Sequence, residues 1–150
     1  MNTMVTKFKP TTQPLYTPWH RLTRFVTKQA IALLLGVKLK DIDRIERWAR
    51  VLLVVGPHLS RFVSYADLPP IPHVAPPTAK DYLYWRRRWG KVAPKFWAEF
   101  YADFFAQASN LEELFNWGQI AIIAAQDMPQ AQADWLKNKY NREQFCREYF

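Results

Sequence analysis

Apolar residues recur at helical spacing through most of this chain, and few glycines interrupt them. The 150 residues contain only four glycines, which is too few for a turn-rich β-sandwich. Between helix-capping signals the apolar positions return every three or four residues, as they do on the buried face of an amphipathic helix. No alternating strand pattern of useful length is evident. We therefore predict an all-α fold, a single-domain helical bundle of about five to six helices.

Local composition divides this predicted bundle into segments. Residues 1–16 are polar and interrupted by proline, which predicts a flexible basic arm. The remaining residues, 17–150, are expected to form the helical domain. Within it we predict a helical hairpin over 17–56, a proline-rich connection over 66–77 that is extended or lies along the wall of the domain, and aromatic-rich helices over 78–150.

Start and stop signals support these helices. Gly36 follows a run of apolar residues and is expected to end the first helix. A second helix is expected over 41–55, with Trp48 among the residues facing inward. Thr78 and Asp81 resemble a capping box at the start of a later helix, with Asp in place of the usual Glu or Gln.

Charge is distributed unevenly along the chain. Residues 1–98 carry 17 Lys or Arg against five Asp or Glu, whereas residues 99–134 carry six acids and no Lys or Arg. The net charge is +8 at pH 7. A basic body favours phosphate-rich partners, with nucleic acid first and an anionic membrane surface second. A basic surface that serves only solubility is the alternative.

The candidate nucleic-acid contacts are cations on the outer faces of the predicted helices. They are Arg21, Arg24, Lys28, Lys40, Arg44, Arg47, Arg50, Arg87, Arg88, Lys91 and Lys95. Aromatic residues are interleaved with the last four of these, and exposed Tyr84 or Trp85 could stack on unpaired bases. The alternative is that Trp85 belongs to the core, as its shared helical face with Tyr82 favours.

The acidic segment supplies candidates for docking a protein partner. They are Glu99, Asp103, Glu112 and Glu113. Acids on helices whose aromatic faces form the core would be free to meet a basic neighbour.

One segment resembles a known DNA-binding motif. Residues 27–48, TKQAIALLLGVKLKDIDRIERW, carry a small residue four positions before a turn glycine, here Ala32 and Gly36, and an apolar residue six positions after it, Ile42. This pattern resembles the helix-turn-helix of repressor-type DNA-binding proteins. The resemblance implies that Arg44 lies on a recognition helix and reads guanine. An ordinary αα-hairpin has the same spacing and is the alternative.

Catalytic and metal-binding patterns are not evident. The sequence shows no zinc-ligand spacing, no phosphate-binding glycine loop and no nucleophile elbow. The single cysteine, Cys146, cannot form an internal disulfide and fits a reducing compartment. Apolar runs are too short to span a bilayer, and no secretory leader is visible. We expect a cytoplasmic protein that is not an enzyme and has no cofactor, metal or integral membrane segment.

The favoured interpretation is a non-enzymatic, basic, helical protein that binds RNA or DNA as a small structural subunit of a nucleoprotein complex. Its other expected partners are further protein subunits or a second copy of itself. In size, charge and predicted helical character the chain is similar to the small helical subunits of CRISPR effector complexes. Two alternatives remain open at this point: a helix-turn-helix DNA-binding regulator, and a protein-interaction or membrane-surface adaptor.

Overall fold

The computed structural model describes residues 20–89 and 95–150. The predicted arm over 1–16 lies outside this part of the chain. The helices are α1 (Lys28–Leu35), α2 (Ala79–Trp89), α3 (Lys95–Gln107), α4 (Leu111–Ala125) and α5 (Gln130–Tyr149). The strands are β1 (Arg44–Arg47), β2 (Val51–Gly56) and β3 (Leu59–Ser64), and short 3-10 helices are η2 (Thr23–Phe25), η3 (Leu39–Asp41) and η4 (Tyr65–Asp67). The fold is therefore mixed α/β, and the all-α prediction is wrong.

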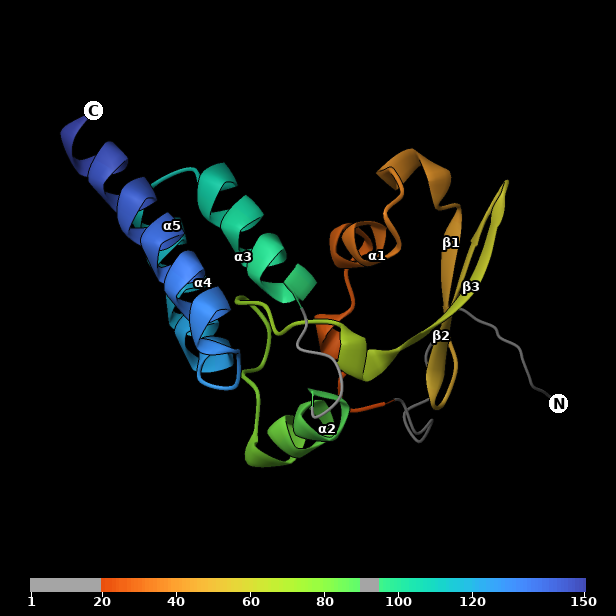
Figure 1. Cartoon of the computed structure of the whole chain (residues 1–150). Helices are drawn as coiled ribbons and strands as arrows, with labels where there is room; N and C mark the ends of the chain where they lie inside the picture. Colours follow the sequence, from red (N-terminus) through yellow and green to blue (C-terminus); the bar gives the residue numbers. More distant parts are fainter. Residues whose placement is uncertain (1–19, 90–94) are drawn as a thin grey trace, which may run out of the picture.

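The sheet and the long helices lie at opposite ends of the molecule (Figure 1). Helix α3 packs against α4 and α5, and together these three form the helical end. Helix α1 lies between this end and the sheet and contacts α3. Helix α2 packs against η4, which directly follows the last strand. Helices α1 and α3 thus connect the two ends.

The sheet replaces the second helix of the predicted hairpin over 17–56. Strand β2 is central and pairs antiparallel with β1 and β3, with Arg44 opposite Val55 and Val51 opposite Ser64. Apolar residues spaced three and four positions apart favoured a helix in this segment. The run from Val51 to Val55, however, is rich in β-branched residues, which favour strands. The first half of the hairpin is also shorter than expected, since α1 begins only at Lys28.

A close contact between β2 and η3 holds one end of the sheet in place. A Cβ on Gly56 would lie 1.9 Å from the carbonyl oxygen of Asp41, so only glycine fits where β2 passes η3. The same glycine pairs with Leu59 across a two-residue hairpin loop. Gly36, in contrast, ends α1 as predicted, with a φ of 69° in the left-handed region.

Side-chain alternation gives the sheet one buried face. Leu52 and Val54 on β2 and Val63 on β3 are almost completely buried. The pairing register places Val63 opposite Leu52, so these three residues share a face. They belong to one core cluster that extends through Phe25 to the aromatic residues of α3.

The proline-rich connection lies along the wall of the domain, one of the two arrangements expected for it. Prolines contribute no backbone N–H, so a buried proline-rich segment leaves mainly carbonyl oxygens to be satisfied. The indole of Trp97 donates to the Asp67 carbonyl at 2.8 Å, and the indole of Trp85 donates to the Leu68 carbonyl at 3.1 Å. The Tyr101 hydroxyl donates to the Pro70 carbonyl at 2.7 Å. Trp85 is therefore a core residue, as its shared face with Tyr82 favoured.

Candidate nucleic-acid interface

The second face of the sheet is exposed and carries aromatic rings. Trp48 follows β1 directly, and Phe62 lies on β3 opposite Leu53, on the face away from Val54. Trp48 is 46% exposed and Phe62 is 59% exposed. Their ring centroids lie 5.2 Å apart at an interplanar angle of 68°. The prediction that Trp48 faces the core was wrong, because on a sheet it lies on the opposite side from the buried residues.

Hydrogen bonds hold Trp48 in place. Its indole N–H donates to Glu46 Oε1 at 3.1 Å, and Glu46 Oε2 accepts from Arg44 Nε at 2.8 Å. The Tyr65 hydroxyl donates to the backbone carbonyl of Trp48 at 2.6 Å. The hydrogen bond from Arg44, followed by that from Trp48, lowers the pKa of Glu46. Glu46 therefore stays ionised near neutral pH and keeps accepting from both side chains.

Exposed arginines lie on the same strands, but the pairing register divides them between the two faces of the sheet. Arg50 lies in the turn between β1 and β2, two residues after Trp48, whereas Arg47 lies opposite Leu52 and Arg61 opposite Val54, on the face away from the rings. All three are exposed, and among the residues that the structure describes they make no ion pair. Arg44, on the aromatic face, is neutralised in part by Glu46, and Lys40 is exposed on η3 just before the sheet. The sheet end thus combines exposed rings with uncompensated positive charge.

The structure does not form a helix-turn-helix in residues 27–48. Residues 44–47 form β1, where the resemblance implies a recognition helix. Arg44 therefore lies on a strand and bonds to Glu46, and the arrangement that would place it in a major groove is not formed. Gly36 and Ile42 keep the turn and the buried position of the motif, but they lead into a sheet.

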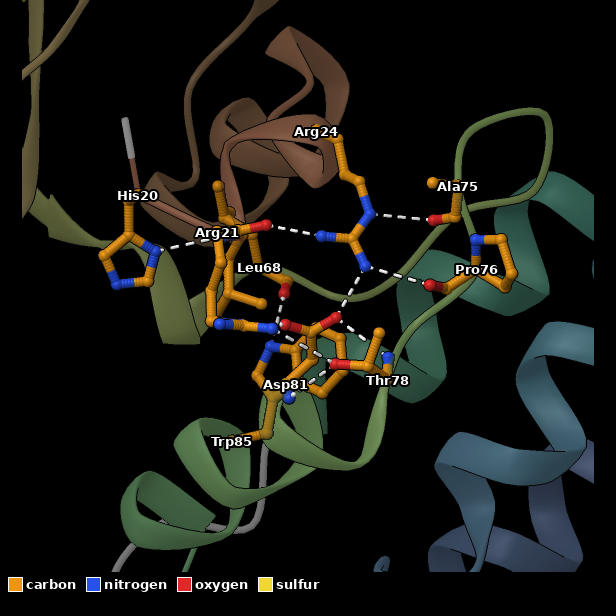
Figure 2. Close-up of polar contacts among 10 residues, drawn as sticks. His20, Arg21, Arg24, Leu68, Ala75, Pro76, Thr78, Asp81 and Trp85 are labelled. Atoms are coloured by element: carbon orange, nitrogen blue, oxygen red, sulfur yellow. Dashed lines mark hydrogen bonds and ion pairs between the residues drawn. The ribbon is translucent and has the colours of Figure 1, made fainter. Parts of the chain in front are cut away.

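Arg21 and Arg24 are bound to a buried carboxylate (Figure 2). Arg21 Nε donates to Asp81 Oδ1 at 2.7 Å, and an Arg24 terminal nitrogen donates to Asp81 Oδ2 at 2.5 Å. Arg24 also donates to the carbonyls of Ala75 and Pro76 at 2.8 and 2.9 Å. These two arginines join the residues at and just before η2 to the start of α2, so their charge is bound within the protein and they lie outside the candidate interface.

The other predicted cations do not gather at the sheet. Lys28 is the exposed first residue of α1, and Arg87 is exposed on α2, with its guanidinium carbon 5.9 Å from the centre of the Tyr84 ring. Lys95 lies 4.0 Å from Glu99, one turn further along α3. Lys91 and the side chain of Arg88 lie outside the described part of the chain, so the predicted basic stripe over 88–95 is not described.

The predicted docking acids lie on α3 and α4, away from the sheet (Figure 1). Glu99 faces Lys95, as described above, and Asp103 is exposed one turn beyond it, where partial burial and then the charge of Glu99 raise its pKa. Glu112 is exposed in the first turn of α4. Glu113 lies 2.6 Å from the ring of His73. The acids therefore do not form one cluster.

Sequence reasoning missed two residues of the interface, Trp48 as an exposed ring and Phe62. The signal for them is the β-branched run of β2 followed by the turn residues Gly56 and Pro57, which together indicate a strand that ends in a hairpin loop. Once a hairpin is assumed, Phe62 falls on the face opposite Val63.

The part of the chain that the structure describes shows neither a metal cluster nor a membrane-spanning helix. Among residues 20–89 and 95–150, no group of three His, Cys, Asp or Glu side chains could hold a metal ion. No helix in the same residues is long and apolar enough to cross a membrane. Comparison with protein-family models, curated proteins and solved structures found no match for this chain.

Proposed function

We propose that this chain is a non-enzymatic protein that binds single-stranded nucleic acid through the sheet β1–β3. The observation that carries the proposal is the exposed ring pair of Trp48 and Phe62, with Arg44 on the same face of the sheet and exposed Arg50 in the adjoining turn. Exposed rings on a small antiparallel sheet, with cations around them, suit bases that are free to stack and a backbone that is negatively charged.

The geometry of the two rings favours unpaired bases. Because the planes of Trp48 and Phe62 are inclined at 68°, they offer two separate faces instead of one continuous stack. Bases of a single strand can turn to meet such faces, whereas bases inside a duplex already stack on each other and present only their edges. We therefore expect tighter binding to single strands than to duplex of the same length.

The interface contains few groups that could read a base. Stacking is tolerant of sequence because every base has an aromatic face, and contacts from arginine to phosphate carry no sequence information. Glu46 already accepts from Arg44 and Trp48. We therefore expect binding that depends weakly on sequence and strongly on salt.

We extend the proposal to an assembly, because the acidic side chains of α3 and α4 could bind other protein subunits. Glu112 and Asp103 are exposed on α4 and α3, and these helices belong to the helical end of the molecule (Figure 1). A protein that holds a polyanion at one end and presents acids at the other suits a subunit of a larger nucleoprotein complex.

The test is a salt series of binding titrations with the full chain against single-stranded RNA, single-stranded DNA and duplex DNA of equal length. A Trp48→Ala/Phe62→Ala variant should weaken binding to single strands by at least about tenfold, given the usual stacking energy per base. Phe145→Ala is the matched control, because Phe145 is an exposed ring on α5. Absence of binding to any of the three at low salt would reject the proposal and leave the adaptor interpretation.

A further inference from the structure

An apolar groove lies between α4 and α5, at the end of the molecule away from the sheet. Its volume is about 530 Å³, with Ala121 and Ala125 of α4 and Leu136 and Tyr140 of α5 among its lining residues. Tyr140 approaches α4 closely, since a Cβ on Gly118 would lie 2.4 Å from its ring. The hollow is therefore part of a closely packed helix pair.

An apolar stripe on α4 continues from the groove onto the open surface. Leu111, Phe115 and Ile122 recur at intervals that place them on one face of α4, and all three are exposed. Ile122 lines the groove and is 65% exposed. One surface thus carries both a projecting apolar side chain and a hollow that could receive one. Uncovered apolar surface of this kind marks sites of interaction.

Two opposite charges on α5 border the same groove. Asp134 and Lys137 both line it, three positions apart and therefore on one face of the helix. Asp134 accepts a hydrogen bond from the neutral amide of Gln130 at 2.8 Å, and Lys137 makes no ion pair with any residue in the described ranges. Among the residues that the structure describes, neither charge is therefore neutralised by an ion pair.

The α4–α5 face is complementary to itself, because it carries a hollow, a projecting apolar side chain and two opposite charges. We propose that this face is a dimer interface with a second copy of this chain. A two-fold axis that places α5 antiparallel to its counterpart sets Asp134 of one copy opposite Lys137 of the other, twice. The same operation directs Ile122 of each copy towards the groove of the other. A single apolar surface with both a projection and a hollow needs no other partner.

The charge of the helical end permits this pairing. Residues 95–150 carry five Lys or Arg and eight Asp or Glu, whereas the excess of positive charge lies in the rest of the chain. A dimer formed through α4 and α5 therefore keeps the two basic sheets apart, since the sheet is at the far end of each molecule (Figure 1).

The test uses charge reversal and sedimentation of the full chain, without nucleic acid, up to about 0.1 mM. Asp134→Lys and Lys137→Asp should each weaken the dimer by at least about tenfold, because each creates two like-charge contacts across the axis. The double reversal should restore the affinity to within about threefold of the unmodified chain. A monomer at all concentrations, or a double reversal as weak as either single one, overturns the proposal.

A second pair of variants tests the groove itself. Ile122→Glu should abolish the dimer, whereas Ile123→Glu is the matched control, because Ile123 is exposed on the next position of α4 but does not line the groove. Both side chains are exposed, so neither change should disturb folding, which circular dichroism and thermal unfolding would verify. Equal weakening by the two variants would place the contact elsewhere on α4 and overturn the proposal.

Discussion

Asp81 Oδ1 accepts a hydrogen bond from Arg21 Nε at 2.7 Å, although Asp81 is fully buried and lies 60 residues further along the chain. The same carboxylate binds Arg24 and accepts from the backbone N–H of Thr78 at 2.9 Å, and the Thr78 hydroxyl in turn accepts from the backbone N–H of Asp81. The capping box predicted for residues 78–81 is thereby confirmed, and it also anchors the segment that precedes α1.

Replacing Asp81 should destabilise the fold. In Asp81→Ala the charges of Arg21 and Arg24 lose their partner and the start of α2 loses its cap. Because both arginines are partly exposed and can regain water, we expect a loss near the lower limit for breaking a buried pair, about 3 kcal/mol. Urea unfolding followed by circular dichroism measures it. Glu46→Ala, which breaks an exposed ion pair, should cost less than about 1 kcal/mol. Equal losses of unfolding free energy in the two variants would contradict the prediction that the buried ion pairs of Asp81 stabilise the fold more than the exposed pair of Glu46.

Acid should remove the stabilisation that Asp81 provides. Burial alone raises the pKa of Asp81, but hydrogen bonds from the Thr78 backbone, Arg21 and Arg24 outweigh it, and its pKa lies below the ordinary value. The folded state therefore favours the carboxylate. Its contribution is complete above the unfolded pKa of about 4 and is lost as the pH falls through the lower folded value. The difference in unfolding free energy between the natural chain and Asp81→Asn should thus shrink below about pH 4. A difference that stays constant from neutral pH to strong acid would contradict this.

Gly118 should be sensitive to a single added methyl group, although alanine is the better helix former. A Cβ there would lie 2.4 Å from the ring of Tyr140, which also contacts the ring of Phe105 and cannot turn away freely. Gly118→Ala should therefore cost about 1–3 kcal/mol. In a Tyr140→Ala background the clash is gone, and the same change should stabilise α4 by up to about 1 kcal/mol. A double-mutant cycle measured by thermal unfolding gives both numbers, and absence of a sign change would show that the ring moves aside.

Local signals predicted the start of α2 and the end of α1 well because each signal acts within a few residues. The Thr78 hydroxyl caps the helix that contains Asp81. Gly36 ends α1 because glycine readily adopts the left-handed φ found at that position. Neither of these two signals depends on the rest of the chain. The predicted helices after residue 78 correspond to α2–α5 for this reason.

The sheet was missed because two periods compete in the same residues. Ile42, Ile45 and Leu52 fit helical spacing, yet β1 pairs with β2, and the Asp43 N–H just before β1 donates to the Val55 carbonyl at 2.7 Å. The paired residues of β1 and β2 lie five to eleven positions apart, beyond the spacings of three and four that the helical interpretation followed.

The same limit affects the candidate interface. Arg21 and Arg24 have the spacing of a solvated helix face, and nothing near them in the sequence indicates that Asp81 binds both. Their positive charge is used inside the protein, so charge counted along the sequence overstates what a ligand would meet. Near Trp48 and Phe62 the exposed positive charge is that of Arg44, which bonds to Glu46, and of Arg50.

Arg50 leads to a prediction about salt dependence. Arg50→Ala should lower the slope of log affinity for single strands against log salt by about 0.7, because an arginine that neutralises one phosphate releases its counterion. The Arg50 side chain is exposed and makes no ion pair with a described residue, so its removal should leave the unfolding free energy nearly unchanged. Arg142→Ala is the matched control, since Arg142 is also exposed and unpaired among the described residues but lies on α5. A reduced slope in Arg142→Ala, or an unchanged slope in Arg50→Ala, would place the nucleic acid elsewhere on the protein.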